Sequence, residues 1–169
     1  MEVKIVCGDI LATKSEAIII GINSIGPWVG TVFQRLNWAT SNHFVNQLAD
    51  AIDLLEDQET LFAAGPEKND NVFENVIFVI DNLVSELHEI ILAGLKEAET
   101  HCLSNVALPL IRAGVNFGVK EKNMDEIIKG MVKAIGLFEK TKPNYIKSIT
   151  FVIYKNEDLY QMVGAGLFK

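Results

Sequence analysis

The chain has 169 residues, of which 49% are apolar and 22% charged, and its 15 basic and 22 acidic side chains give a net charge of −7. This length fits one compact domain, residues 1–169, with a sizeable buried core, and the composition excludes a disordered chain. The negative charge disfavours general nucleic-acid binding, which depends on clustered Lys and Arg. A small anionic ligand remains compatible with it, because backbone dipoles can bind an anion locally.

Cysteine usage and apolar run lengths indicate where the protein works. Cys7 and Cys102 are too few for a disulfide framework or a thiolate metal site. The start MEVKIV has no basic segment followed by a long apolar stretch, and the apolar run at 17–22 is too short to cross a membrane. We therefore expect a protein of the reducing cytoplasm, with no membrane partner and no cofactor.

Short apolar runs alternate with longer helical patterns along the chain. The runs predict strands at residues 3–6, 17–21, 60–64, 76–80, 106–110 and 148–153. Helical spacing of apolar residues predicts helices over residues 44–55, 84–95 and 124–135, and a short last helix over 157–163. Asn123 is the predicted N-cap of the third helix. This order predicts a three-layer α/β/α sandwich with a mixed, mostly parallel sheet.

In such a sheet, ligands bind outside the carboxyl ends of the strands, which directs attention to residues 7–10, 21–30, 112–118 and 154–157. Asp9 follows the first strand, where its carboxylate either caps a turn or accepts a hydrogen bond from an exocyclic amine such as that of adenine. Tyr154 ends the last strand, where its ring either packs in the core or stacks on a base.

Two glycine-containing loops complete the set. The segment 21–30 leaves a buried strand, carries Asn23 and ends at Gly30, just before a helix start near Thr31. Either its amides at the helix start bind an anion while Asn23 bonds a sugar hydroxyl, or it is an ordinary strand-to-helix loop, and on this segment alone the second interpretation is the favoured one. The segment 112–118 has two glycines around Val115, Asn116 and Phe117, and its amides can line a concavity for a diphosphate. Arg112 either reaches a phosphate or is a solvated surface arginine, and the second interpretation is the favoured one.

The four segments, in this order, resemble the macrodomain family of ADP-ribose-binding modules. The resemblance covers nearly the whole chain and rests on Gly-Asp-Ile after the first strand, Ala-Ile-Ile-Ile-Gly-Ile-Asn-Ser, Val-Ala-Leu-Pro-Leu-Ile with its Gly-Val-Asn-Phe-Gly loop, and Phe-Val-Ile-Tyr-Lys-Asn-Glu-Asp-Leu-Tyr. It implies that Asp9 bonds the adenine amino group, Tyr154 packs against the adenine, and Asn23 contacts the distal ribose. It also implies that the amides of the loop wrap the diphosphate and that Phe117 lies against the distal ribose. The ligand-binding residues it implies are Asp9, Ile10, Asn23, Gly30, Gly114, Val115, Asn116, Phe117, Gly118 and Tyr154.

The chain departs from the pattern of hydrolytic members in its first loop. Ile20 stands at the position of their first asparagine, and Gly-Pro-Trp-Val-Gly at 26–30 replaces their glycine run. No Asp or Glu lies between Glu16 and Asp50, so one usual supplier of a carboxylate to position the attacking water is missing. Asn116 also lengthens the second loop by one residue before Phe117.

Three functions follow from these features. The favoured one is binding of ADP-ribose or an ADP-ribosylated macromolecule. The second is hydrolysis of a mono-ADP-ribosyl linkage, with Asn23 as the catalytic residue. The third is a degenerate scaffold for protein contacts, in which Trp28 fills the cleft.

No metal site is predicted, because the chain has no HExxH motif and its three histidines, His43, His88 and His101, are expected to be surface residues on separate helical stretches. Cys7 is expected to be a small buried apolar residue.

Overall fold

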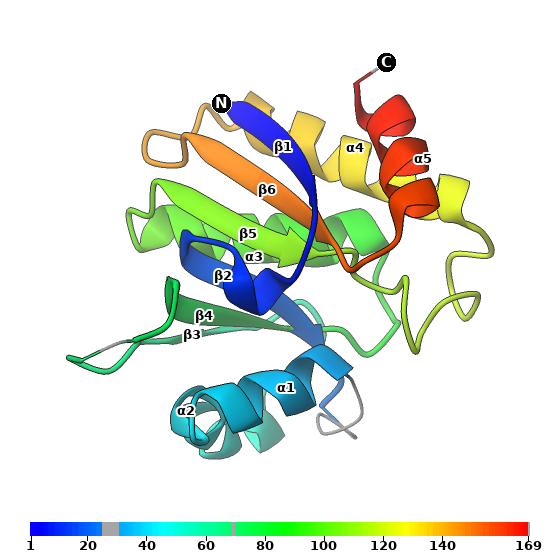
Figure 1. Ribbon diagram of the computed structural model, residues 1–169. Helices are drawn as coiled ribbons and strands as arrows, with labels where there is room; N and C mark the ends of the chain where they lie inside the picture. The colour runs from blue at the N-terminus through cyan, green and yellow to red at the C-terminus, as the bar shows by residue number, and fades with distance from the viewer. Residues whose placement is uncertain (25–30, 69, 169) are drawn as a thin grey trace.

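Six strands form one sheet in the order β1-β6-β5-β2-β4-β3 (Figure 1). The computed structural model describes residues 1–24, 31–68 and 70–168. The strands are β1 (Glu2–Cys7), β2 (Ser15–Ile22), β3 (Thr60–Ala63), β4 (Phe73–Ile80), β5 (Asn105–Pro109) and β6 (Ser148–Ile153). Edge strand β3 runs antiparallel to β4, and all other neighbouring strands are parallel. The predicted mixed, mostly parallel sheet is confirmed.

Helices cover both faces of this sheet. They are α1 (Thr31–Ala39), α2 (His43–Ala49), α3 (Leu87–Thr100), α4 (Met124–Lys140) and α5 (Glu157–Leu167), with short 3-10 turns η1 (Ile10–Ala12) and η2 (Ile52–Leu54). One buried cluster joins the sheet to α3, α4 and α5, and a second joins it to α1 and α2. Figure 1 shows the two groups of helices on opposite sides of the strands. The predicted three-layer sandwich is therefore confirmed.

The central strand β2 explains why its sequence reads as an unbroken apolar run. Ile18 and Ile20 belong to the cluster under α1 and α2, whereas Ile19 belongs to the cluster under α3 and α4. All three side chains are at most 3% exposed. A strand buried on both faces needs apolar residues at every position, since successive side chains point to opposite faces.

Capping residues set the starts of the long helices. Asn123 accepts a hydrogen bond from the Glu126 amide, which confirms it as the N-cap of α4. Helix α3 begins with a capping box formed by Glu86 and Glu89. The helix predicted from residue 84 therefore begins three residues later, and Val84 is a 72% exposed residue ahead of it.

Four other helix ends differ from the expectation. Helices α3 and α4 extend to Thr100 and Lys140, beyond the predicted ends at residues 95 and 135. Helix α2 ends at Ala49, and the apolar periodicity that predicted a helix to residue 55 continues through η2. Helix α5 extends to Leu167, beyond the predicted end at residue 163. Among the described residues, the structure has no helix that is both long and apolar enough to cross a membrane.

Candidate functional site

The first predicted site residue, Asp9, lies two residues after the end of β1 and caps η1. Its Oδ1 accepts a hydrogen bond from the Leu11 amide at 3.1 Å, and its carbonyl accepts one from the Thr13 hydroxyl at 2.8 Å. The capping interpretation of Asp9 is thus confirmed. Its second carboxylate oxygen, Oδ2, accepts a hydrogen bond from the guanidinium of Arg35 in α1. Capping therefore uses only one of the two carboxylate oxygens.

Tyr154 lies beside Asp9 because β1 and β6 are parallel neighbours, with Cys7 opposite Ile153. The Arg35 guanidinium carbon is 5.1 Å from the centre of the Tyr154 ring, and the Lys155 ammonium is 5.3 Å from it. The ring is not core packing, since Tyr154 is 53% exposed. One guanidinium therefore contacts both residues that were predicted to meet a base, and these residues lie together at the carboxyl edge of the sheet.

Arg35 was not predicted as a site residue. Its position in the sequence gives a weak indication. Arg35 lies one turn into the helix that follows β2, and β2 ends at the same carboxyl edge of the sheet as β1 and β6. Nothing in the sequence alone says that this turn of α1 faces η1.

The charges around Asp9 keep it ionised. Burial by itself raises the pKa of Asp9, but the hydrogen bonds from Arg35 and from the Leu11 amide, and the positive charges of Arg35 and Lys155, lower it below the ordinary 3.8. At neutral pH the side chain is therefore a carboxylate, which can only accept hydrogen bonds.

The segment after β2 is only partly described. Asn23 is half-buried, and the amide and hydroxyl of Ser24 donate to Oδ1 of Asn82 at 2.9 and 3.0 Å. Gly30 and Trp28 lie outside the described residues. Ile10 is 3% exposed and packs in the core, so its side chain is not available to a ligand.

The loop after β5 exposes both its apolar side chains and several amides. Val115 is 67% and Phe117 46% exposed. The Phe117 amide donates to the Gly114 carbonyl at 3.1 Å, so it is used within the loop. Within the described parts of the chain, the amides at 114, 115, 116 and 118 donate to no protein acceptor. Four unpaired donors on one loop can bind an anion.

Only one glycine of this loop is required by its backbone. Gly118 has a φ of 78°, in the left-handed region that favours glycine. A Cβ added to Gly114 would meet no atom within 4 Å. The small size of Gly114 is therefore not needed for packing, and it leaves open space beside the loop.

Both interpretations of Arg112 are wrong. The Arg112 side chain is fully buried and can reach neither solvent nor a ligand phosphate. Its Nε and Nη2 donate to the two oxygens of Asp81 at 3.0 and 2.8 Å, and its Nη1 donates to Glu121 at 2.7 Å. Nη2 also donates to the Ser85 carbonyl at 2.9 Å. Arg112 therefore ties the base of the loop to the end of β4 and to the segment before α3.

The cluster of Asp81, Arg112 and Glu121 holds the two ends of the 113–120 loop together. Burial by itself lowers the pKa of Arg112, but its hydrogen bonds to Asp81 and Glu121, together with their negative charges, raise it above its ordinary range. Within the described residues, Oε2 of Glu121 is buried without a hydrogen-bond partner. The loop that presents the free amides is thus fixed at its base by a network of buried charges.

Solved macrodomain structures resemble this chain over nearly its whole length. The Oceanobacillus iheyensis macrodomain with ADP matches with a TM-score of 0.72 and 17% identity, over 97% of this chain and 88% of that one. The Trypanosoma brucei macrodomain in complex with ADP-ribose matches with a TM-score of 0.75 and 13% identity, over 97% of this chain and 68% of that one. No protein-family model matches the sequence, and neither does any curated protein sequence.

The chain has the macrodomain fold. The resemblance read from the sequence motifs is confirmed at the level of the fold. At identities this low, the likeness is one of architecture and assigns no role to any single residue of the site.

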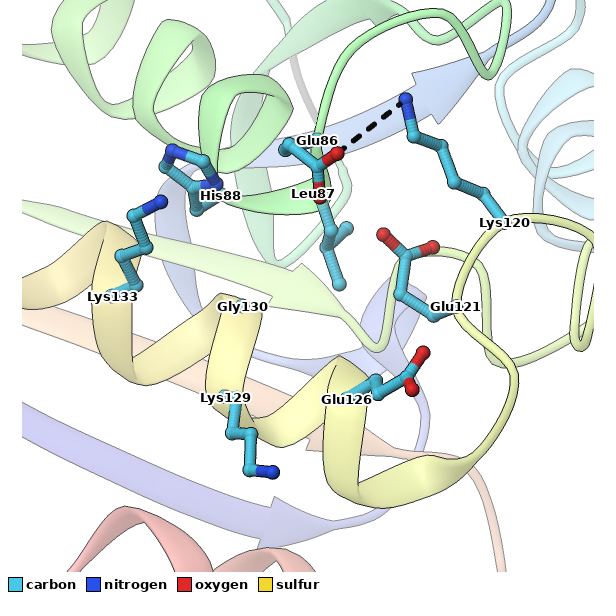
Figure 2. Close-up of a pocket in the computed structure, with 9 residues that line it drawn as sticks. All are labelled: Glu86, Leu87, His88, Lys120, Glu121, Glu126, Lys129, Gly130 and Lys133. Atoms are coloured by element: carbon cyan, nitrogen blue, oxygen red, sulfur yellow. Dashed lines mark ion pairs between the residues drawn. The ribbon is translucent and has the colours of Figure 1, made fainter.

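A pocket of about 440 Å³ lies between α3 and α4, next to Lys120 and Glu121. Figure 2 shows the Lys120 ammonium directed at Glu86, 3.9 Å away, and Lys133 directed towards His88. The residues that line the pocket are Glu86, Leu87, His88, Lys120, Glu121, Glu126, Lys129, Gly130 and Lys133. Its charges are mixed in sign, which does not favour any one class of ligand.

The structure shows where Cys7 and the three histidines lie. Cys7 is exposed at the end of β1, so the expectation of a small buried residue is wrong. His43 begins α2, His88 lies in the first turn of α3, and His101 follows the end of α3. Over residues 1–24, 31–68 and 70–168, no group of three or more His, Cys, Asp or Glu side chains could hold a metal ion.

Proposed function

We propose that the chain binds ADP-ribose, or the ADP-ribosyl group of a modified macromolecule, at the carboxyl edge of the sheet. The observation that carries the proposal is that one guanidinium, that of Arg35, contacts both Asp9 and Tyr154, which follow the ends of the neighbouring parallel strands β1 and β6. A carboxylate that accepts hydrogen bonds, next to an exposed aromatic ring, can recognise a base that has an exocyclic amine.

The loop after β5 supplies what a diphosphate needs. Its unpaired amides can donate to phosphate oxygens without a lysine or arginine, which suits a chain with net charge −7. The exposed Val115 and Phe117 give an apolar surface against which a sugar can pack. Macrodomain structures with ADP and with ADP-ribose bound support the same ligand class.

Calorimetric titration with ADP-ribose tests the proposal. Tyr154→Ala removes the stacking ring and is expected to weaken binding by about 1–3 kcal/mol, roughly 5- to 150-fold in Kd. Tyr145→Ala is the matched control, because Tyr145 is also exposed, at 46%, but lies ahead of β6 at the opposite end of that strand. Equal affinities in the two variants, or no binding by the wild type, would contradict the proposal.

Asp9 needs a variant that separates capping from recognition. Asp9→Asn keeps an N-cap for η1, since asparagine caps as well as aspartate. It loses the negative charge that would accept a hydrogen bond from an amine. We expect Asp9→Asn to weaken binding with little change in the free energy of unfolding. Asp9→Ala should weaken binding and also lower the free energy of unfolding, because it removes the cap.

Hydrolysis of an ADP-ribosyl linkage is the second candidate function. The stretch between Glu16 and Asp50 holds no carboxylate to activate water, so we infer binding as the primary role. Turnover of a mono-ADP-ribosylated protein that is lost in Asn23→Ala would overturn this order. The scaffold alternative depends on Trp28, outside the described residues, and predicts that ADP-ribose does not bind at all.

A further inference from the structure

Arg35 engages both groups of the proposed base site at once. It bonds Oδ2 of Asp9, and its guanidinium lies over the Tyr154 ring. Because the Leu11 amide bonds Oδ1, both oxygens of the carboxylate already have a donor. The Arg35 and Asp9 side chains are 29% and 25% exposed, so the pair is partly shielded from water.

A base that bonds Oδ2 of Asp9 and stacks on the ring face next to Arg35 needs the positions that the guanidinium holds. An exocyclic amine must donate to the carboxylate, and a stacked base must lie on the ring face. The guanidinium of Arg35 is planar, donates a hydrogen bond to the Asp9 carboxylate and lies over the Tyr154 ring. A bound base would make the same two kinds of contact. The two occupants therefore compete, and the arginine must move aside before the base can enter.

We infer that Arg35 is an internal competitor for the base, which holds the Asp9–Tyr154 subsite in a self-occupied state and weakens binding of adenine ligands. The inference rests on the proposed function and adds a residue that sets its affinity and selectivity. A ligand then binds only the fraction of molecules in which Arg35 has left, so its apparent Kd equals the intrinsic Kd divided by that fraction.

The competitor acts on one part of the ligand, which makes it testable. Adenosine 5′-monophosphate carries the base and one phosphate, whereas ribose 5-phosphate carries a sugar and a phosphate but no base. Calorimetric titration of both, and of ADP-ribose, compares the wild type with Arg35→Ala. Lys96→Ala is the control, because Lys96 is an exposed cation in α3, on the opposite face of the sheet, and its loss changes the net charge equally.

For Arg35→Ala we expect Kd values about three- to tenfold lower for ADP-ribose and adenosine 5′-monophosphate, and an unchanged Kd for ribose 5-phosphate. Lys96→Ala should leave all three near the wild-type values. Arg35→Lys keeps the charge but loses the planar fork, and it should give an intermediate Kd. Because alanine is the best helix former, α1 should persist, and thermal unfolding of each variant checks this.

The other outcomes overturn the inference in distinguishable ways. Weaker binding of adenosine 5′-monophosphate by Arg35→Ala would mean that Arg35 contacts the base directly instead of competing with it. Unchanged binding would mean that the contact is inert. A tighter Kd for ribose 5-phosphate as well would mean that the effect is not confined to the base. A weaker Kd for ribose 5-phosphate would mean a general charge effect, because the variant loses a cation that attracts the phosphate. No binding of ADP-ribose by either wild type or variant would refute the proposed function itself.

Discussion

The buried Arg112 cluster gives the sharpest prediction for stability. Arg112→Met removes a fully buried cation and leaves the Asp81 and Glu121 carboxylates, which are 3% and 6% exposed, without it. Breaking a buried ion pair by removing one partner costs about 3–5 kcal/mol, because the remaining charge is uncompensated. In a domain of this size 1 kcal/mol shifts Tm by about 2–4 °C, so Tm should fall by roughly 6–20 °C.

An exposed ion pair provides the comparison. Lys4 lies 3.0 Å from Glu2, with side chains that are 49% and 64% exposed. Lys4→Met makes the same change of residue class at the surface and should cost about 0–1 kcal/mol. Urea unfolding of both variants and the wild type measures the two losses on one scale.

A second variant distinguishes charge from geometry. Arg112→Lys keeps a positive charge, but one ammonium cannot bond both oxygens of Asp81, Glu121 and the Ser85 carbonyl as the fork does. Its loss of stability should lie between those of the other two variants. If Arg112→Met cost no more than Lys4→Met, the account of a clamped loop base would be refuted.

Three further predictions concern local structure. Gly94→Ala should destabilise the protein by about 1–3 kcal/mol, because the added Cβ would lie 2.5 Å from a side chain of β2. Gly136→Ala, whose Cβ would meet nothing within 4 Å, should stabilise it by up to about 1 kcal/mol. Chemical denaturation measures both changes. Gly118→Ala should cost about 1 kcal/mol for its φ of 78° while Gly114→Ala is neutral for folding, and opposite results would contradict the loop geometry. Burial by itself raises the pKa of Asp57, but its hydrogen bonds from Ser85 and from backbone amides lower that pKa below 3.8. The stability that the Asp57 carboxylate contributes is therefore present above pH 3.8 and is lost as the pH falls further. Between pH 7 and pH 3, Asp57→Asn should lose less stability than the wild type.

The fold could be predicted from the sequence because its signal is local and repeated. The apolar runs in β2 and β4 are long enough to indicate strands buried on both faces. Helix starts were predicted less accurately where a capping residue, and not the apolar pattern, decides where the helix begins. Val84 fits the apolar spacing of α3, but the helix begins only after its N-cap, Glu86.

The site could be predicted only in part. Asp9 and Tyr154 follow strand ends, and the topology of a parallel sheet brings such positions together. Arg112 was misjudged because Asp81 and Glu121, which make its burial possible, belong to other segments, and a loop arginine with no known partner is normally solvated. Arg35 was missed for the same reason, since the packing of α1 on η1 decides which turn of the helix faces Asp9.

Amide chemical shifts of ¹⁵N-labelled protein, followed by NMR as ADP-ribose is added, test the whole account most directly. The account predicts saturable shifts concentrated at residues 9–11, 114–118 and 154–155. Shifts that gather instead on the residues of the α3–α4 pocket, or that never saturate, would contradict it.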